Sequence, residues 1–462
     1  MERAKFRMPT AYTILFLLII LVAAATWLVP AGSYRYVNEA PVAGSYHAVA
    51  QSPQGAGAVL KAAFAGFYDA VDVCVFILMV GGFLGVVMKT GAVDAGVGRV
   101  IQRLGGREKW LIPILMIAFG LGGTTYGMWE ETMAFYPLLI PVFLAAGYDA
   151  VVGISVILLG AGAGIISSTV NPFATGIAAG FAGVSLGEGI LLRAAQWVVF
   201  EGAAIWFVMA YAARVKRDPA RSVVGVGAGK LQANMAETVA FTPKRKVILA
   251  VFGLTFLIMI YAVIPFDEMG LPLPALGWWF PELSALFLVS GVAIGLIDRM
   301  GEEAIAETYV AGCADLLGVA LIIGISRGLT VLMNDGQITD TILHWGERAL
   351  SGTGPVSFVL LVYLLYLPLT VLIPSSSGLA TLSVPLVAPL GRFAGVGGDL
   401  VVTAFQSASG LVNIITPTAA VVMGALALGH VPYDKWVKYV WKLILYFFLL
   451  TLAFLMLGVV FS

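Results

Sequence analysis

Charged side chains are scarce in this sequence. Lys, Arg, Asp and Glu together make up 11% of its 462 residues, less than half of the roughly 25% that soluble domains carry. Hydrophobic residues reach 60%, and a soluble domain cannot bury that share because its outer surface faces water. The composition therefore excludes a soluble enzyme and a disordered scaffold. It predicts an all-α polytopic membrane protein whose first partner is the lipid bilayer.

Cysteine, histidine and net charge are also low. The two cysteines, Cys74 and Cys313, lie in apolar stretches, and the chain has three histidines. We therefore expect neither a disulfide framework nor a metal site, and no cofactor apart from a coupling ion. The 26 basic and 26 acidic residues cancel, which excludes the basic surface that nucleic acid requires.

Apolar runs of about 20 residues recur along the chain, as membrane-spanning helices require. The first follows Arg3, Lys5 and Arg7 and is longer than the roughly 7–15 residues of a signal-peptide core, so we predict an uncleaved helix with a cytoplasmic N-terminus. The expected spans are 11–30, 71–88, 190–212, 247–264, 282–297, 312–333 and 440–461.

Lys and Arg gather in three segments, 89–109, 214–246 and 435–442, which are assigned to the cytoplasm. The stretches 31–70 and 265–281 carry few or none and are assigned to the outside. Four further apolar stretches are interrupted by small and polar residues: 110–147, 150–186, 355–392 and 399–430.

The assignment of sides has a consequence for the interrupted stretches. The basic segments on either side of 110–212 are both cytoplasmic. If 150–186 crosses outward and 190–212 returns, 110–147 must enter and leave on the cytoplasmic side. We predict a re-entrant hairpin that turns at 122–127, and by the same count one from the outside that turns at 374–378. The other two stretches are predicted to be helices broken at 167–172 and 413–418.

The two interrupted halves resemble each other. Residues 137–149 read PLLIPVFLAAGYD, and residues 385–399 read PLVAPLGRFAGVGGD. Asn171-Pro172 has its counterpart in Thr416-Pro417 at a similar spacing. Since the two copies start on opposite sides of the membrane, the sequence predicts an inverted repeat.

The four predicted breaks carry side chains that suit a binding site. Irregular backbone at membrane depth is stable only where protein or a water-lined cavity satisfies it, and broken helices around a central site are typical of transporters. The alternative is that Ser and Thr only join helices. Candidate substrate-binding residues are Thr124, Thr125, Tyr126, Glu130, Glu131, Ser168, Thr169, Asn171, Ser375, Ser376, Ser377, Asn413, Thr416 and Thr418. Of these, Thr125, Glu131, Asn171, Ser376 and Thr416 are also candidates for coupling to Na⁺ or H⁺.

Charges inside apolar runs need an explanation, because each costs roughly 2.5–3.5 kcal/mol on insertion scales. Glu130 and Glu131 carry a proton, bind Na⁺ or contact a substrate ammonium, or else favour a helix N-terminus. Arg327 either pairs with an acid such as Asp315 or holds a substrate carboxylate. For Glu201 we expect an interhelical hydrogen bond.

An enzyme is not predicted. Residues 324–328 match G-x-S-x-G, but that motif requires a strand–turn–helix elbow and a nearby His, and here it lies in an apolar helix. Glu130 and Glu131 have no pair of buried His residues with which to hold a catalytic metal.

Two blocks of the chain resemble a known family. Residues 120–180 contain GLGGTTYGMWEET and GAGAGIISSTVNPFATGIAAG, and residues 373–439 contain IPSSSGLATLSVPLVAPL and ITPTAAVVMGALAL. Both resemble YfcC-type carriers of the anaerobic C4-dicarboxylate carrier (DcuC-like) family, in the ion transporter superfamily. The resemblance implies a scaffold domain and a transport domain with two opposed hairpins and two broken helices. It also implies elevator-type movement, a homodimer and a prokaryotic plasma membrane.

The resemblance also implies where the site lies. It places the hairpin tips on Thr124, Thr125 and Ser375 to Ser377, and the helix breaks on Ser168, Thr169, Asn171, Thr416 and Pro417. Neither tip has the Asn of the Ser-Asn-Thr tips in divalent-anion carriers. Some relatives resembling this branch are described as arginine/ornithine exchangers, and two glutamates beside a tip would suit a cationic amino acid.

Together these features predict a secondary active transporter of a small carboxylate-bearing solute, either an amino acid or a C4-dicarboxylate. It would work by ion coupling or exchange. A channel, a membrane enzyme and a non-transporting membrane protein are the alternatives. Amphipathic stretches at 91–106 and 336–350 are expected to lie along the membrane surface. The predicted regions are 1–109 (scaffold), 110–186 (first transport repeat), 187–350 (linking and scaffold helices), 355–430 (second transport repeat) and 431–462 (C-terminal helix).

Overall fold

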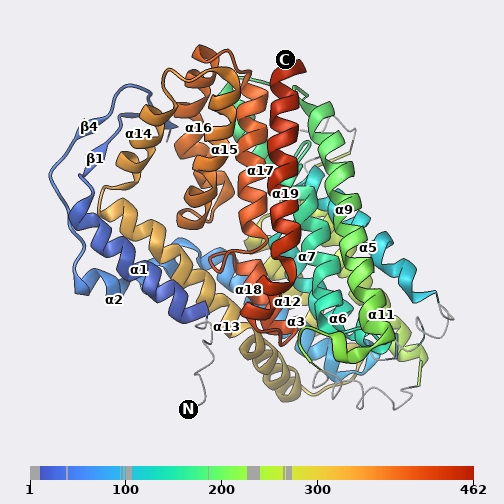
Figure 1. Ribbon diagram of the computed structural model, residues 1–462. Coiled ribbons are helices and arrows are strands. Elements are labelled where there is room, and N and C mark those ends of the chain that lie inside the picture. The colour runs from blue at the N-terminus through green and yellow to red at the C-terminus, as the bar shows by residue number, and fades with distance from the viewer. Residues whose placement is uncertain are drawn as a thin grey trace, which may run out of the picture.

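The described residues fold mainly into helices, which pack in two groups (Figure 1). The computed structural model describes residues 11–37, 40–93, 95–96, 99, 107–185, 187–225, 240–263, 266 and 273–461. The longer helices are α1 (Ala11–Leu28), α2 (Ala56–Asp69), α3 (Val71–Lys89), α5 (Leu111–Thr125), α6 (Tyr136–Ala145), α7 (Ala150–Ile166), α9 (Ile190–Arg217), α11 (Pro243–Val263), α12 (Phe280–Ile297), α13 (Glu302–Asp335), α14 (Thr339–Leu350), α15 (Pro355–Leu372), α16 (Ser376–Phe393), α17 (Gly398–Asn413) and α19 (Tyr433–Phe461). Shorter helices are η1 (Glu108–Trp110), η2 (Glu130–Phe135), the π-helix η3 (Pro172–Gly176), α8 (Ile177–Ala182), η4 (Pro219–Arg221) and α18 (Ala420–Leu428).

Among the described residues, 7 helices are long and apolar enough to cross a membrane: α3, α9, α11, α12, α13, α15 and α19. This confirms a mostly helical, multi-pass membrane protein and six of the seven predicted spans. The seventh, 11–30, corresponds to α1, whose apolar part Tyr12–Leu28 is shorter. Helix α15, predicted as a hairpin arm, is by length and composition also a candidate span.

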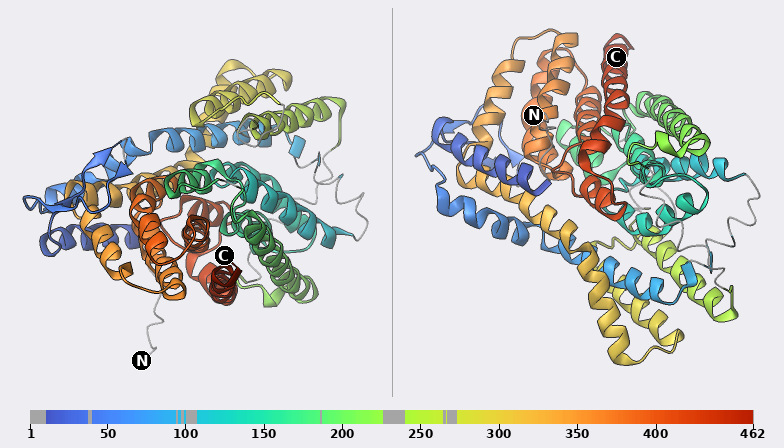
Figure 2. Two further views of the ribbon diagram at one scale, coloured as in Figure 1. Left: turned by 90° about the horizontal axis from the view of Figure 1, so that it is seen from above. Right: turned by 60° about the horizontal axis from the view of Figure 1, so that its bottom comes forward.

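The helices pack in two groups, seen one above the other in the right view of Figure 2. Helix α13 packs along α3 and α2, with α12 on α3, α11 on α12 and α1 on α13. The second group contains α5 on α7, α15 on α17, α9 on α7 and α19 on α17. The groups meet where α18 contacts α13 and where α14 contacts α15 and α16.

Small residues bring α5 and α7 close together. A Cβ added at Gly123 would lie 2.3 Å from the carbonyl oxygen of Ala161, and one added at Gly164 would lie 2.2 Å from that of Gly120. Such distances leave room for hydrogen only, as in small-residue contacts between membrane helices. The glycines of this segment therefore fix the first interrupted stretch against the next helix.

The order of helices repeats in the two interrupted halves. The series α5, α6, α7, α8, α9 corresponds to α15, α16, α17, α18, α19. The last members run antiparallel, because Phe200 near the start of α9 stacks on Phe447 while Tyr211 near its end contacts Tyr439. The antiparallel packing of these two helices is compatible with the predicted inverted repeat.

The structure refines several expectations about local structure. The amphipathic helix expected at 336–350 is present as α14, and it begins at Thr339. The stretch 31–70, assigned to an external segment, contains α2, which packs against α13. It also contains two antiparallel strand pairs, β1 (Gly32–Ser33) with β4 (His47–Ala48) and β2 (Tyr36–Val37) with β3 (Ala40–Pro41). Much of 91–106, and parts of 214–246 and 265–281, lie outside the described residues.

Candidate functional site

Four interruptions of helices meet around one cavity. Helix α5 ends at Thr125, α7 ends at Ile166, α15 ends at Leu372 and α17 ends at Asn413, which matches the four break positions predicted from sequence. The cavity has a volume of about 160 Å³ and is lined from both halves of the chain. Its walls also include Ser326 and Arg327 of α13 and Trp279, so both groups of helices contribute to it.

The first break is tied to the tip at the end of α5. The Thr124 hydroxyl donates to the carbonyl of Ser167 (2.9 Å) and accepts from the Thr169 amide (3.1 Å). The Thr169 hydroxyl donates to the carbonyl of Thr124 (2.9 Å). In the same break, Ser168 accepts from Thr175 (2.8 Å). The Thr124 and Thr169 hydroxyls thus satisfy backbone groups at the ends of α5 and α7.

Helix α17 supplies further hydrogen-bond donors to the carbonyls at the end of α7. The Gln406 amide donates to the carbonyl of Ile165 (2.8 Å), and the Ser407 hydroxyl donates to that of Ile166 (3.0 Å). Both carbonyls belong to the last turn of α7, where no further helical amide follows. The two broken helices therefore hold each other at the level of the cavity.

The second break is held by different donors. Within it, the hydroxyls of Thr416 and Thr418 are 2.8 Å apart. Its freed carbonyls accept from α19: Trp436 Nε1 donates to Ile414 (3.1 Å) and the Tyr433 hydroxyl donates to Ile415 (2.7 Å). A buried indole and phenol thus replace the hydroxyls that hold the first break.

The second tip supplies a helix N-terminus to the cavity. The Ser375 hydroxyl caps α16 by accepting from the Gly378 amide (3.2 Å), and it lies 3.4 Å from the Ser377 hydroxyl. The cavity is lined by Pro374 to Ser377 and also by Thr418 to Val421, where α18 begins. Two helix N-termini, each with partial positive charge, therefore border the same space.

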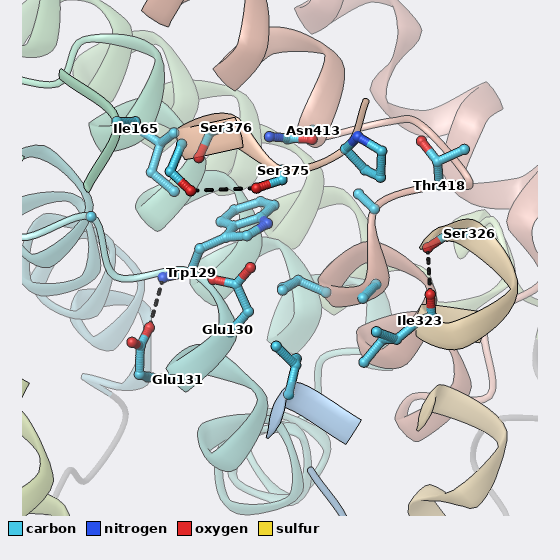
Figure 3. Close-up of a pocket in the computed structure, with 18 of the residues that line it drawn as sticks. Trp129, Glu130, Glu131, Ile165, Ile323, Ser326, Ser375, Ser376, Asn413 and Thr418 are labelled. Carbon is cyan, nitrogen blue, oxygen red and sulfur yellow. Dashed lines mark hydrogen bonds between the residues drawn. The ribbon is translucent and has the colours of Figure 1, made fainter. Parts of the chain in front are cut away.

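The two glutamates after the first tip differ in their surroundings (Figure 3). Glu130 points toward the middle of the cavity beneath the ring of Trp129. The carboxylate of Glu131 turns back and accepts from the Trp129 amide (3.1 Å), and its residue is only 9% exposed. Both line the cavity, so the site carries two acidic groups from adjacent positions.

Arg327 brings a positive charge from the other group of helices. Its Nε lies 3.8 Å from Oδ2 of Asp69, at the end of α2. The suggested partner Asp315 is wrong, because it lies twelve residues earlier in α13, about 18 Å along the helix axis. Arg327 also lines the cavity, so pairing with Asp69 and facing a substrate are compatible.

The cavity collects part of the candidate set. Eight of the predicted residues line it: Glu130, Glu131, Asn171, Ser375, Ser376, Ser377, Asn413 and Thr418. Six do not: Thr124, Thr125, Tyr126, Ser168, Thr169 and Thr416. Of these, Thr124, Thr169, Ser168 and Thr416 form the hydrogen bonds within the breaks, and Thr125 donates to Leu121 of its own helix (2.6 Å).

Several residues of the site were missed by the sequence reasoning. Gln406 lines the cavity, and Trp129 stands between the glutamates and the second tip. Gln406 lies seven residues before Asn413, on the same face of α17, so a polar pair with helical spacing was the available signal. Trp436 and Tyr433 gave no such signal.

Three further expectations concern charge and chemistry. Glu201 is buried, but neither carboxylate oxygen has a hydrogen-bond partner in the described part of the chain, so the expected interhelical bond is absent there. The G-x-S-x-G segment lies within α13, where Gly328 packs against the carbonyl of Ala62 in α2. Among the described residues, no three His, Cys, Asp or Glu side chains gather to hold a metal.

Comparison with known proteins also indicates a membrane carrier. The family model described as "C4-dicarboxylate anaerobic carrier" (DcuC) matches residues 8–460. An uncharacterized protein of Haemophilus influenzae is 33% identical over 96% of this chain and 95% of its own length. An Escherichia coli K12 protein, named "Putative basic amino acid antiporter YfcC", is 30% identical over 94% of this chain and 93% of its own length.

A solved structure overlaps more weakly. MtrF of Neisseria gonorrhoeae, described among antimetabolite efflux pumps, gives a TM-score of 0.46 at 18% identity, over 97% of this chain and 94% of that chain. That score is too low to assign a common fold. The family model and the two relatives cover nearly the whole chain, and on that basis the protein belongs to the DcuC family of membrane carriers.

Proposed function

We propose that this protein is a secondary active transporter of a small carboxylate-bearing solute, and that the solute is a basic amino acid. The observation that carries the proposal is the distribution of charge in one cavity. Glu130 and Glu131 lie on one side, and Arg327 and the N-termini of α16 and α18 border the same space.

Each part of a basic amino acid has a complementary group there. Helix N-termini and a guanidinium attract a carboxylate, so we place the α-carboxylate of the solute near Ser376, Thr418 and Arg327. Carboxylates favour ammonium groups, which assigns the amino groups to Glu130 and Glu131. The hydroxyl and amide oxygens of Ser375, Ser377, Asn171 and Asn413 then orient the solute.

A C4-dicarboxylate is the second candidate, favoured by the description of the family. It would bring two negative charges next to Glu130 and Glu131, and like charges disfavour each other most where water is excluded. The relative named as a basic amino acid antiporter supports the first candidate.

The transport cycle is part of the same proposal. We infer that 110–186 and 355–430 form the moving transport domain, with re-entrant hairpins at both tips. The regions 1–109 and 187–350 supply the scaffold of a homodimer, and 431–462 is the C-terminal helix. The transport domain would carry the cavity across the plasma membrane by an elevator movement, with the N-terminus in the cytoplasm.

Coupling follows from the same residues. Thr125, Glu131, Asn171, Ser376 and Thr416 are proposed to couple transport to Na⁺ or H⁺ or to support exchange. A channel would instead conduct solute without a saturable, occluded step, which separates it experimentally from a carrier.

The deciding experiment is uptake into proteoliposomes. Purified protein is tested with radiolabelled arginine, ornithine, lysine, leucine, succinate and fumarate, with and without Na⁺ and pH gradients and with unlabelled solute inside. Saturable uptake of basic amino acids supports the proposal. Preference for succinate or fumarate would establish the second candidate, and non-saturable flux would establish a channel.

Charge-neutral variants test the site itself. Glu130→Gln and Glu131→Gln should each lower uptake of arginine by about tenfold or more, because a lost charge-assisted hydrogen bond is worth roughly 1.5–3 kcal/mol. Glu188→Gln is the matched control, since Glu188 lies in a turn outside the cavity and accepts from the Ser185 amide (2.9 Å). Equal uptake by all three variants would refute the assignment of the glutamates.

A further inference from the structure

The outer face between α9 and α19 carries a second concave site. A groove of about 670 Å³ lies there, and the two helices run side by side (Figure 1). Helix α9 contributes Val199, Ala203, Ala210 and Arg214, and helix α19 contributes Lys442 and Tyr446. None of its lining residues lines the cavity at the helix breaks, so the groove is a separate site.

The lining of the groove is mostly apolar and follows one face of α9. Its α9 residues recur every three or four positions from Val199 to Arg214, so they form one stripe about 22 Å long. Ala203 and Ala210 leave room on the α9 side of the groove because their side chains are small, while Trp206 is 73% exposed at the rim. Beneath the groove the two helices are closed by aromatic contacts such as Phe207 on Tyr439, with ring centroids 4.9 Å apart. This shape fits a single hydrocarbon chain.

The lining of the groove includes two positively charged side chains. Arg214 and Lys442 both line it, and neither forms an ion pair with a carboxylate in the described part of the chain. Their neighbours do: Lys216 pairs with Glu108 (3.2 Å) and Lys438 with Asp434 (3.7 Å). Arg214 Nε donates to the carbonyl of Ala210 (3.2 Å), which turns its guanidinium back along the groove. Two exposed cations without a carboxylate partner among the described residues therefore border an apolar channel.

The position of these cations suits a lipid headgroup. Helix α9 has 28 residues and is about 42 Å long, more than the roughly 30 Å of hydrocarbon in a bilayer. Arg214 lies three residues before the last residue of α9, where a helix of this length leaves the hydrocarbon core. Lys442 follows Tyr439, whose ring contacts Phe207 and Tyr211, so its backbone lies deeper than Arg214 and its side chain extends toward the interface from there.

We propose that this groove binds one anionic phospholipid, with its phosphate between Arg214 and Lys442 and one acyl chain along Ala203 and Ala210. Basic pockets between membrane helices select lipids with net negative charge, whereas a zwitterionic headgroup offsets its own phosphate. The site does not depend on which solute the cavity at the helix breaks transports.

The test is native mass spectrometry of the full chain, released from detergent after titration with phosphatidylglycerol or phosphatidylcholine. The protein should retain one phosphatidylglycerol in preference to phosphatidylcholine. The double variant Arg214→Gln/Lys442→Gln should lose about 25-fold in relative affinity for phosphatidylglycerol, roughly fivefold for each cation, and little for phosphatidylcholine.

Two further variants separate charge from shape. Arg217→Gln/Lys438→Gln removes two cations from the same helices outside the groove, and should change the affinity less than about twofold. Ala210→Trp fills the floor of the groove without changing charge, and should weaken both lipids.

The outcomes decide between lipid and simpler explanations. Equal retention of both lipids, or an equal loss in the control pair, would overturn the proposal. So would competition by glycerol phosphate, which has the headgroup charge and no acyl chain. If the double variant does not fold, Lys442→Gln alone decides, with a loss of roughly fivefold expected and no loss contradicting the site.

Discussion

Replacing Gly127 by Ala should disable the site through its neighbour Asn171. Gly127 follows the tip of α5 with φ of 79°, in the left-handed region that costs a residue with a Cβ about 1–2 kcal/mol. A Cβ there would lie 2.5 Å from Nδ2 of Asn171 and 2.6 Å from its Cγ and Oδ1. Real Cβ contacts are essentially never that short, so the Asn171 side chain must shift from its position in the cavity that both residues line.

Gly147 provides a matched control. It has nearly the same conformation, with φ of 84°, but an added Cβ meets nothing within 4 Å. Gly147→Ala should therefore lose about 1–2 kcal/mol of unfolding free energy and keep normal uptake. Gly127→Ala should lose at least as much stability and about tenfold or more in uptake, because one hydrogen bond from Asn171 to the solute is worth roughly 1.5 kcal/mol.

The assay combines thermal unfolding in detergent with arginine uptake into proteoliposomes. A third variant, Gly127→Ala with Asn171→Ala, removes the side chain that the new Cβ meets. It should be more stable than the sum of the two single changes predicts, since the two residues are in contact. The reasoning fails if Gly127→Ala transports as well as Gly147→Ala, or if the two changes at 127 and 171 are simply additive.

Three further changes test other contacts. Thr124→Val removes the hydroxyl that ties the first tip to the first break and should lower the free energy of unfolding by about 1–3 kcal/mol. The hydroxyl of Thr125 bonds only within its own helix, so Thr125→Val should cost much less, and equal losses would contradict this. Glu201→Met removes a buried carboxyl without a partner among the described residues and should raise the unfolding temperature, so a lowered temperature would reveal a bond that the carboxyl makes. Burial and the hydrogen bond to Asp340 raise the pKa of Tyr36 above its ordinary value of about 10, so this contact stabilises the folded 31–48 segment below pH 10 and is lost as pH rises further. Protease cleavage there should accelerate only above about pH 10, and constant cleavage up to pH 12 would argue against the contact.

The helix breaks were predictable because they interrupt long apolar runs with polar and small residues. Ser375 to Ser377 and Asn171 stand out against their neighbours, and counting basic segments fixed how many crossings remained. These signals are local in sequence. They place the ends of α5, α7, α15 and α17 without knowledge of any long-range contact.

The partners across the fold were not predictable in the same way. Arg327 lies near Asp69 because glycines let α13 pack closely on α2. The sequence analysis assigned the stretch 31–70 to the outside from its few Lys and Arg residues, and that signal carries no information about this contact. Trp436 and Tyr433 look like ordinary interfacial aromatic residues until the second break lies beside them. Hydrogen bonds between distant segments carry no periodic signature in the sequence.

The unlike donors at the two breaks restrict how the halves could be recombined. Thr124 and Gln406 serve the first, while Trp436 and Tyr433 serve the second. A chimaera built by fusing one half to an inverted duplicate of itself would preserve the succession of helices. It would nevertheless leave main-chain oxygens without hydrogen-bond donors in a buried interior, so the two halves are not interchangeable.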